Sequence, residues 1–178
     1  SIYHNGGTGQ VLLGVYADMG GAPITKLGVT PATTINSTAG WQTISLISPI
    51  AVTSGQKVWL AWVFQNNPGI RYVAGTPARA ESPALWSGGM PDPFGGASFA
   101  NYKYSVYCTY STGAPSAKTL GNTEVYGSSS TTANRRAQTI IFPEAGTIQS
   151  ISIYHNGGTG QVLLGVYADV GGAPVTKL

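Results

Sequence analysis

Few side chains in this sequence could carry out chemistry. The chain contains six acidic residues, two histidines (His4 and His155) and one cysteine, Cys108. A zinc site needs three or four nitrogen or sulfur ligands, and the one histidine and one cysteine of each repeating unit do not supply them. There is no Gly-x-Ser-x-Gly motif, and the glycine-rich turns lack the lysine of a phosphate-binding loop. We therefore expect that the protein is not an enzyme.

Two aspartates stand in turns that could hold a metal ion. Asp18 and Asp169 are each followed, two residues later, by a pair of glycines. One interpretation is an Asx turn, in which the carboxylate accepts a hydrogen bond from a nearby backbone amide. The other is a calcium ligand, because Ca²⁺ takes six to eight oxygen ligands and backbone carbonyls could complete the set. Both interpretations stay open, and no other cofactor is expected.

The longest stretch without periodicity, residues 75–101, is the strongest candidate for ligand binding. It is rich in glycine and proline, yet it carries aromatic side chains, which a disordered loop would avoid. Aromatic faces stack on sugar rings while a few polar groups bind the hydroxyls. The predicted ligand-binding residues are Trp86, Phe94, Tyr72, Arg79 and Asp92. In the alternative interpretation, the apolar side chains of this segment plug one end of the fold.

The elements that would position these residues belong to a repeat. Residues 1–27 recur at residues 152–178, and the two copies differ at two positions, Met19 against Val170 and Ile24 against Val175. The offset of 151 residues is the size of a whole domain, which predicts a tandem array of similar units cut in mid-repeat. The predicted organisation is most of one unit at 1–110, a linker at 111–120 and the opening strands of the next unit at 121–178.

Short runs of β-branched and aromatic residues separated by Gly, Pro and Asn predict strands throughout. In the run YKYSVYCTY, alternation places Tyr104, Val106, Cys108 and Tyr110 on one face of a strand. Further predicted strands lie at 41–47, 57–65, 70–74, 122–126, 136–142, 147–154 and 161–168. The fold class that this spacing favours is all-β, a two-sheet antiparallel sandwich of jelly-roll type.

Three motifs carry a resemblance to known proteins: SISIYHNGG with LLGVYAD, GWQTISL with SGQKVWLAW, and the closing YKYSVYCTY. The chain resembles bacterial extracellular β-sandwich modules, which occur as accessory domains of large secreted or surface proteins. This resemblance implies a jelly-roll-like sandwich with a strand beginning at Gly40-Trp41. It implies no particular ligand.

The composition limits the classes of partner. Charged residues make up 8% of the chain, the net charge is +3, and Arg135-Arg136 is the one adjacent basic pair. A nucleic-acid-binding protein would carry a denser basic stripe, so we expect no nucleic acid as a partner. The sequence has no long apolar run, and we expect no membrane insertion. Abundant Gly, Ser, Thr and Asn favour a secreted or cell-surface protein, with Cys108 as a small buried residue.

The repeat also predicts an assembly. Both copies of the 27-residue segment suit the same place in one unit, so they compete for it, and the surplus copy is available to another unit. The residues predicted to take part in assembly are Ile153, Tyr154, Val162, Leu164 and Val166. The first hypothesis is a structural or adhesive module whose partners are copies of itself, joined by β-strand pairing into a stalk, fibre or filament. The alternative is a carbohydrate-binding module whose partners are glycans.

Overall fold

The computed structural model describes residues 1–112, 117–130, 134–155, 161–171 and 174–176. The described part is nearly all β-strand, with one short 3₁₀ turn, η1 (Trp86–Gly88), and no α-helix. Hence no described helix has the length and apolar character to cross a membrane. The strands are β1 (Ile2–His4), β2 (Gln10–Gly20), β3 (Ala22–Val29), β4 (Thr33–Thr34), β5 (Gly40–Val52), β6 (Lys57–Phe64), β7 (Ile70–Ser82), β8 (Ser98–Tyr104), β9 (Val106–Ser111), β10 (Ala117–Gly121), β11 (Ser128–Ser130), β12 (Arg135–Ile141), β13 (Gly146–His155), β14 (Gln161–Leu163), β15 (Gly165–Gly171) and β16 (Pro174–Thr176).

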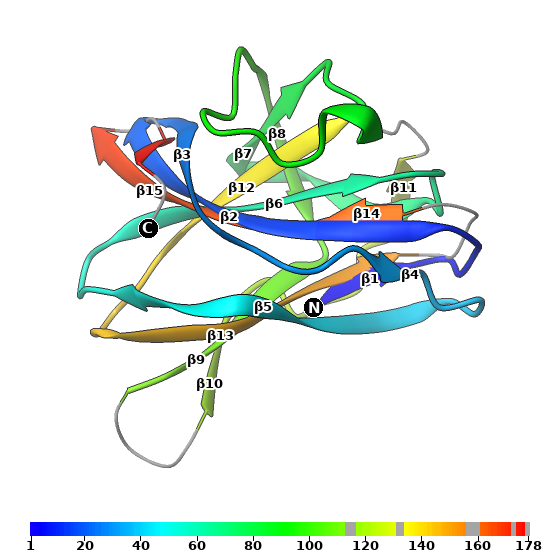
Figure 1. Cartoon of the computed structure of the whole chain (residues 1–178), viewed down its shortest axis with the longest axis horizontal. Helices are drawn as coiled ribbons and strands as arrows, with labels where there is room; N and C mark the ends of the chain where they lie inside the picture. Colours follow the sequence, from blue (N-terminus) through cyan, green and yellow to red (C-terminus); the bar gives the residue numbers. More distant parts are fainter. Residues whose placement is uncertain (113–116, 131–133, 156–160, 172–173, 177–178) are drawn as a thin grey trace.

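These strands are linked by hydrogen bonds into one large mixed sheet. In Figure 1, β5 and β13 run side by side below β2 and β6. The described parallel pairings, β2 with β14 and β2 with β15, all join a residue to its own duplicate, as Val11 joins Val162. The prediction of an all-β fold is confirmed at this level.

The core is continuous and lies between these strands. Its largest fully buried side chains include Trp62, Tyr16 and Phe142. Strand β6 is buried along nearly its whole length, as its unbroken apolar run predicts for a strand covered on both faces. Cys108 is fully buried, and this burial raises the pKa of its thiol to about 12. The thiol therefore packs as a small apolar group.

The run predicted as one strand at 102–110 is divided at Ser105. Tyr104, Val106, Cys108 and Tyr110 are all buried, as the alternation predicted. Before Ser105 the chain pairs with β7, and after it the chain pairs with β1, β10 and β13. The buried Ser105 hydroxyl donates a hydrogen bond to the carbonyl of Glu124, 2.9 Å away. The backbone N–H of Ser105 still donates to the carbonyl of Arg71 at 3.1 Å, so the chain changes partner here while this residue keeps its backbone hydrogen bond.

Several predicted boundaries differ from the structure. β7 continues past residue 74 to residue 82, because β8 and β12 pair with its second half. Residues 122–126 form no strand. The predicted linker at 111–120 ends in β10, which pairs with β9 from Ala117 opposite Ser111 to Gly121 opposite Tyr107. Residues 117–120 therefore extend the sheet.

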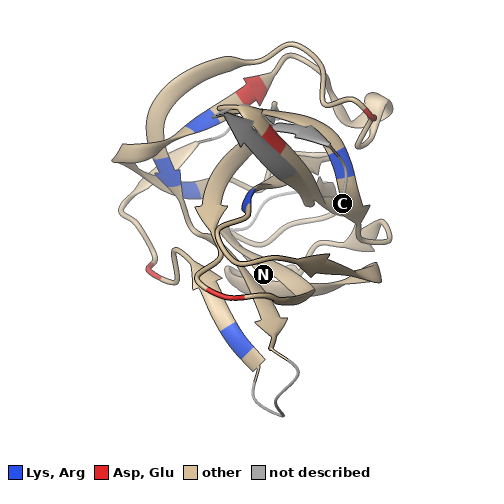
Figure 2. Ribbon diagram, turned by 90° about the vertical axis from the view of Figure 1, so that its left-hand side faces the viewer, with Lys and Arg blue, Asp and Glu red and all other residues tan. Residues whose placement is uncertain are grey.

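Charged side chains are sparse and scattered. Figure 2 shows the lysines, arginines and acidic residues on several strands and loops, without a continuous stripe of one sign. The buried ion pairs are consequently few and local, and the fold depends mainly on apolar burial and strand hydrogen bonds.

Candidate functional sites

The two copies of the repeated segment use the same partners in the fold. Tyr3 of β1 and Tyr154 of β13 both lie opposite Trp41. His4 and His155 both lie opposite Gly40, and both also pair with Ile70. Ile2 and Ile153 share Val106 in the same way. The register of every one of these pairs is conserved at the offset of 151 residues.

The side chains coincide as well. The ring of Tyr3 lies on that of Tyr154, the ring of His4 on that of His155, and the ring of Tyr16 on that of Tyr167. Their polar contacts are also shared. The hydroxyls of Tyr16 and Tyr167 donate to the same carbonyl, that of Pro91, at 2.8 and 3.0 Å.

Because two side chains cannot fill one volume, one copy at a time can occupy this place. We call each 27-residue copy a hairpin, after the antiparallel pairing of β2 with β3 in the first copy. The place that both copies share is called the hairpin seat and is defined by Gly40, Trp41, Ile70, Pro91 and Val106. The copy at 1–27 is joined to the rest of the chain at residue 28, and the copy at 152–178 is joined to it at residue 151. Residues 28–151, the body, therefore carry one seat and are flanked by two hairpins that fit it.

Burial of apolar side chains favours occupation of the seat. Ile153, Val162, Leu164 and Val166, four of the five residues predicted for assembly, are fully buried, and Tyr154 is nearly so. Their counterparts in the first copy, among them Val11, Leu13 and Val15, are fully buried too. Each such side chain contributes about 1.5–3 kcal/mol when it leaves water. A body with an empty seat would expose all of the matching apolar surface.

A buried histidine marks the rim of the seat. The Nδ1 atom of His4 accepts a hydrogen bond from the backbone N–H of Gly6 at 3.1 Å, and Nε2 lies 2.7 Å from Oε1 of Gln42. The amide nitrogen of Gln42 donates to the carbonyl of Thr34, so Oε1 is the acceptor and the ring carries its proton on Nε2. Burial holds the pKa of His4 well below its ordinary value of 6.5, and the seated ring is neutral.

The residues predicted for ligand binding do not form one site. Phe94 is fully buried, with its ring edge-on to Tyr16 at a centroid distance of 5.0 Å, so it offers no face to a ligand. Trp86 is partly buried and packs against the core. Asp92 accepts a hydrogen bond from the backbone N–H of Lys26 at 3.1 Å. Residues 83–97 cover β2 and β3, which agrees with the interpretation that they plug one end of the fold.

The possible calcium ligand Asp18 makes two other contacts. Its Oδ1 accepts a hydrogen bond from the N–H of Gly21 at 2.9 Å, a local side-chain-to-backbone bond like that of the first interpretation but reaching three residues along the chain. Its Oδ2 lies 2.7 Å from the ammonium group of Lys57. Gly20 and Gly21 have φ angles of 66° and 89°, which the turn between β2 and β3 requires. The corresponding side chain of Asp169 lies outside the described residues.

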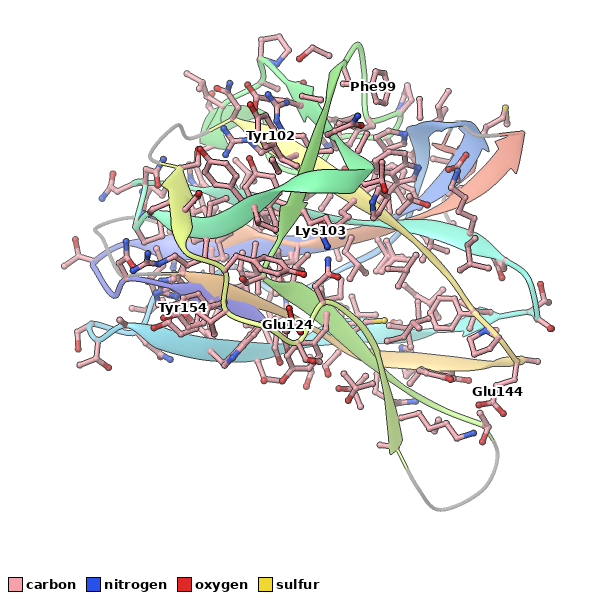
Figure 3. All side chains as sticks on the ribbon, turned by 180° about the vertical axis from the view of Figure 1, so that it is seen from behind. Phe99, Tyr102, Lys103, Glu124, Glu144 and Tyr154 are labelled. Carbon is pink, nitrogen blue, oxygen red and sulfur yellow. The ribbon has the colours of Figure 1, made fainter. Side chains whose placement is uncertain are left out.

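Tyr72 and Arg79, the other two predicted ligand residues, both belong to β7. They line a hollow of about 240 Å³ with Glu81, Tyr102, Tyr104, Ser130 and Arg136. We call this hollow the Glu81 site. Sequence reasoning missed Tyr102, Tyr104 and Arg136, because β8 and β12 reach β7 by long-range pairing. In Figure 3, Tyr102 is well separated from Tyr154, which marks the hairpin seat.

Glu81 lies at the centre of the charges in this site. Its Oε2 is 2.6 Å from Nε of Arg136 and 2.9 Å from Nη1 of Arg79, and its Oε1 accepts a hydrogen bond from Asn134. Burial alone would raise the pKa of Glu81, but Arg136, Asn134 and Arg79 outweigh it and hold this pKa below its usual 4.5. The carboxylate is therefore ionised at neutral pH.

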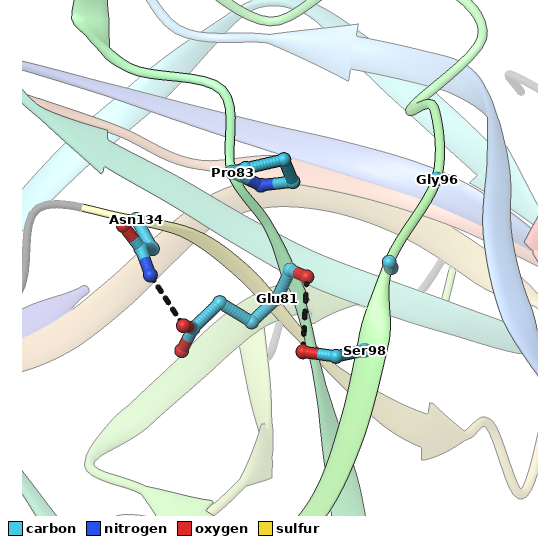
Figure 4. A pocket seen from close by; sticks show the side chains of 6 residues that line it. Glu81, Pro83, Gly96, Ser98 and Asn134 are labelled. Carbon is cyan, nitrogen blue, oxygen red and sulfur yellow. Dashed lines mark hydrogen bonds between the residues drawn. The ribbon is translucent and has the colours of Figure 1, made fainter.

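Glu81 also joins this site to a second hollow of about 330 Å³. The second hollow is lined by Pro83, Gly96, Ala97, Ser98 and Asn134 as well as Glu81. Figure 4 shows the two hydrogen bonds at its edge, from Asn134 to the carboxylate and from the Ser98 hydroxyl to the carbonyl of Glu81. The two hollows together reach the size of ordinary small-molecule sites.

No family model, curated protein or solved structure matches this chain.

Proposed function

We propose that this protein is a structural or adhesive repeat module of a secreted or cell-surface protein. In this proposal, modules assemble head to tail, or by strand exchange, into a stalk, fibre or filament. The observation that carries the proposal is the shared register of the two hairpins, in which Tyr3 and Tyr154 face the same Trp41. A body accepts either hairpin, so each hairpin in a tandem array can complete the body before it or the body after it.

The proposed architecture of one module is a two-sheet, jelly-roll-like sandwich. One group of strands contains β5, β9, β10 and β13 with β1, and the other contains the remaining strands. Among the described residues, strand pairing joins the two groups at one position, where His4 or His155 lies opposite Ile70. The hairpin in the seat thus contributes strands to both layers, and an empty seat would leave edges open in each.

The same geometry supports donation of a hairpin between chains. A closed chain has one hairpin in its own seat and a second, identical one outside it. A chain whose seat is empty can bind that second hairpin by adding its strands to both sheet edges, with backbone hydrogen bonds and apolar burial. The donor loses nothing, because its own seat stays filled.

The experiment tests this donation directly. In the Val15→Asp/Val166→Asp double variant, a carboxylate enters the core from either hairpin, so the seat stays empty. We expect the unaltered chain to form a one-to-one complex with the double variant, seen as a doubled mass in light scattering. The single variant Val166→Asp is the matched control, since its one competent hairpin fills its own seat and none is left to donate. An absence of complex with the unaltered chain, or an equal yield with the control, would refute the proposal.

A further inference from the structure

The Glu81 site has an unbalanced positive charge. Among its described side chains, two guanidinium groups, Arg79 and Arg136, face one carboxylate, Glu81. Arg136 is nearly fully buried and lies 2.6 Å from Glu81 through its Nε, so this pair is the structural core of the site. Arg79 provides the second positive charge at the wall of the hollow.

Arg79 retains hydrogen-bonding capacity. Its Nη1 lies 2.9 Å from Glu81, but neither Nη1 nor the buried Nε has an acceptor with hydrogen-bond geometry. A buried donor without an acceptor is costly, so an acceptor oxygen that a ligand brings to Arg79 is favourable, although Nε and Nη1 lie on opposite sides of the guanidinium and one carboxylate does not bridge these two. The guanidinium fork matches the two oxygens of a carboxylate.

The remaining wall is aromatic. Tyr72, Tyr102 and Tyr104 line the hollow, and the Tyr102 ring is more than one-third exposed. The guanidinium of Arg79 lies over the Tyr102 ring, 5.8 Å from its centroid, so a cation and a partly exposed aromatic ring are neighbours. Tyr72 meets the Tyr102 ring edge-on at 5.2 Å and thereby fixes its orientation. A flat ligand with one apolar face and polar edges fits such a wall.

We propose that the Glu81 site binds a carboxylated sugar. The sugar ring stacks on Tyr102, its carboxylate accepts hydrogen bonds from Arg79, and its hydroxyls donate to Glu81. Glu81 keeps Arg136 and Arg79 in place by its ion pairs. This function is independent of hairpin exchange, because none of its residues belongs to the hairpin seat.

The test uses two probes that differ in the carboxylate alone, methyl β-glucuronide and methyl β-glucoside, with inorganic phosphate as a third. The whole isotopically labelled chain is titrated and its amide resonances are followed by NMR. We expect the glucuronide to shift resonances of β7, β8 and β12 and to bind at least tenfold more tightly than the glucoside. Equal binding of the glucoside would overturn the proposal, and so would equal binding of phosphate, which cannot stack.

Substitutions of single residues test which side chains contact the sugar. Arg79→Ala and Arg79→Lys should each weaken glucuronide binding at least tenfold, since lysine keeps the charge but lacks the fork. Tyr102→Ala should weaken it similarly, and Tyr102→Phe should restore it. Lys118→Ala is the matched control, because it removes one positive charge from β10, outside the site. Undiminished binding by folded Arg79→Lys, with an unchanged unfolding temperature, would overturn the proposal.

Discussion

At the scale of single residues, the most informative side chain is the histidine of the hairpin. With the first copy seated, the neutral ring of His4 donates to Gln42 and accepts from Gly6, and under the proposed exchange the other copy leaves its histidine outside the seat. The chain has two histidines, yet the seat perturbs one of them at a time. The number of histidines whose pKa is lowered in the folded chain, one or two, can therefore be measured from the number of protons taken up on unfolding.

The first prediction concerns pH. The seated histidine has a lowered pKa in the folded state, so below 6.5 the unfolded chain takes up a proton before the folded chain does. Stability is therefore full above pH 6.5 and decreases as the pH falls, by up to about 1.4 kcal/mol per pH unit for one histidine. Urea unfolding at a series of pH values measures how the free energy of unfolding changes with pH. We expect this slope to be larger in the unaltered chain than in a His4→Gln/His155→Gln double variant, by the amount given for one histidine. A difference of twice that size would mean that both rings are seated together.

The second prediction concerns the ion pair of the Glu81 site. Replacing Glu81 by Gln leaves the buried guanidinium of Arg136 without its carboxylate, and breaking such a pair costs on the order of 3 kcal/mol. Glu144→Gln is the control, because the Glu144–Lys118 pair is exposed to water and such surface pairs contribute little to stability. The free energy of unfolding in urea measures both. Similar losses in the two variants would show that Glu81 is not a structural partner of Arg136.

At the scale of elements, the hairpin behaves as an interchangeable part. β1 and β13 present identical residues to Trp41 and Gly40, and β2 and β15 coincide residue by residue. An altered hairpin is therefore replaced by the intact one, and a substitution in one copy is buffered by the other.

This interchange gives the third prediction. Val15→Asp alone, or Val166→Asp alone, should cost about 0.4 kcal/mol, the free energy of losing one of two equivalent arrangements. Together they should cost more than about 4 kcal/mol, because a carboxylate would then have to enter the core. Thermal and urea unfolding of the three variants would measure the non-additivity. A large loss in one single variant would show that a particular copy always holds the seat.

At the scale of the whole molecule, apolar burial and strand pairing outweigh charge. Charged residues make up 8% of the chain, and those that Figure 2 colours are dispersed. Association through the seat would bury residues such as Leu164 and pair backbone groups, neither of which is screened by salt. Binding of an anion at Arg79, by contrast, would be weakened by salt.

The fourth prediction follows from this difference. The dissociation constant of the complex between the unaltered chain and the Val15→Asp/Val166→Asp variant should change less than about threefold between low salt and about 1 M sodium chloride. Analytical ultracentrifugation over a concentration series at both salt levels would measure it. A complex that dissociates in high salt would indicate attraction between charged surfaces and not hairpin donation.

Several properties could be predicted from the sequence because they depend on local pattern or on copy number. Alternation fixed the inward face of Tyr104, Val106, Cys108 and Tyr110, and the apolar run of β6 indicated a strand covered on both faces. The repeat alone predicted that the two copies compete for one place. The boundary errors arose where pairing is long-range, as in the second half of β7, or where a small polar segment joins a sheet, as in β10.

Tertiary structure alone decided which of the candidate ligand residues meet. Phe94 and Trp86 looked like a stacking platform because they are aromatic and stand in a long loop, but the loop folds inward and Phe94 leaves water. Tyr72 and Arg79 gained Tyr102 and Arg136 as neighbours from strands far along the chain. The physical reason is that sequence records composition and periodicity, whereas a site is made by pairing between distant strands, which depends on the packing of the whole core.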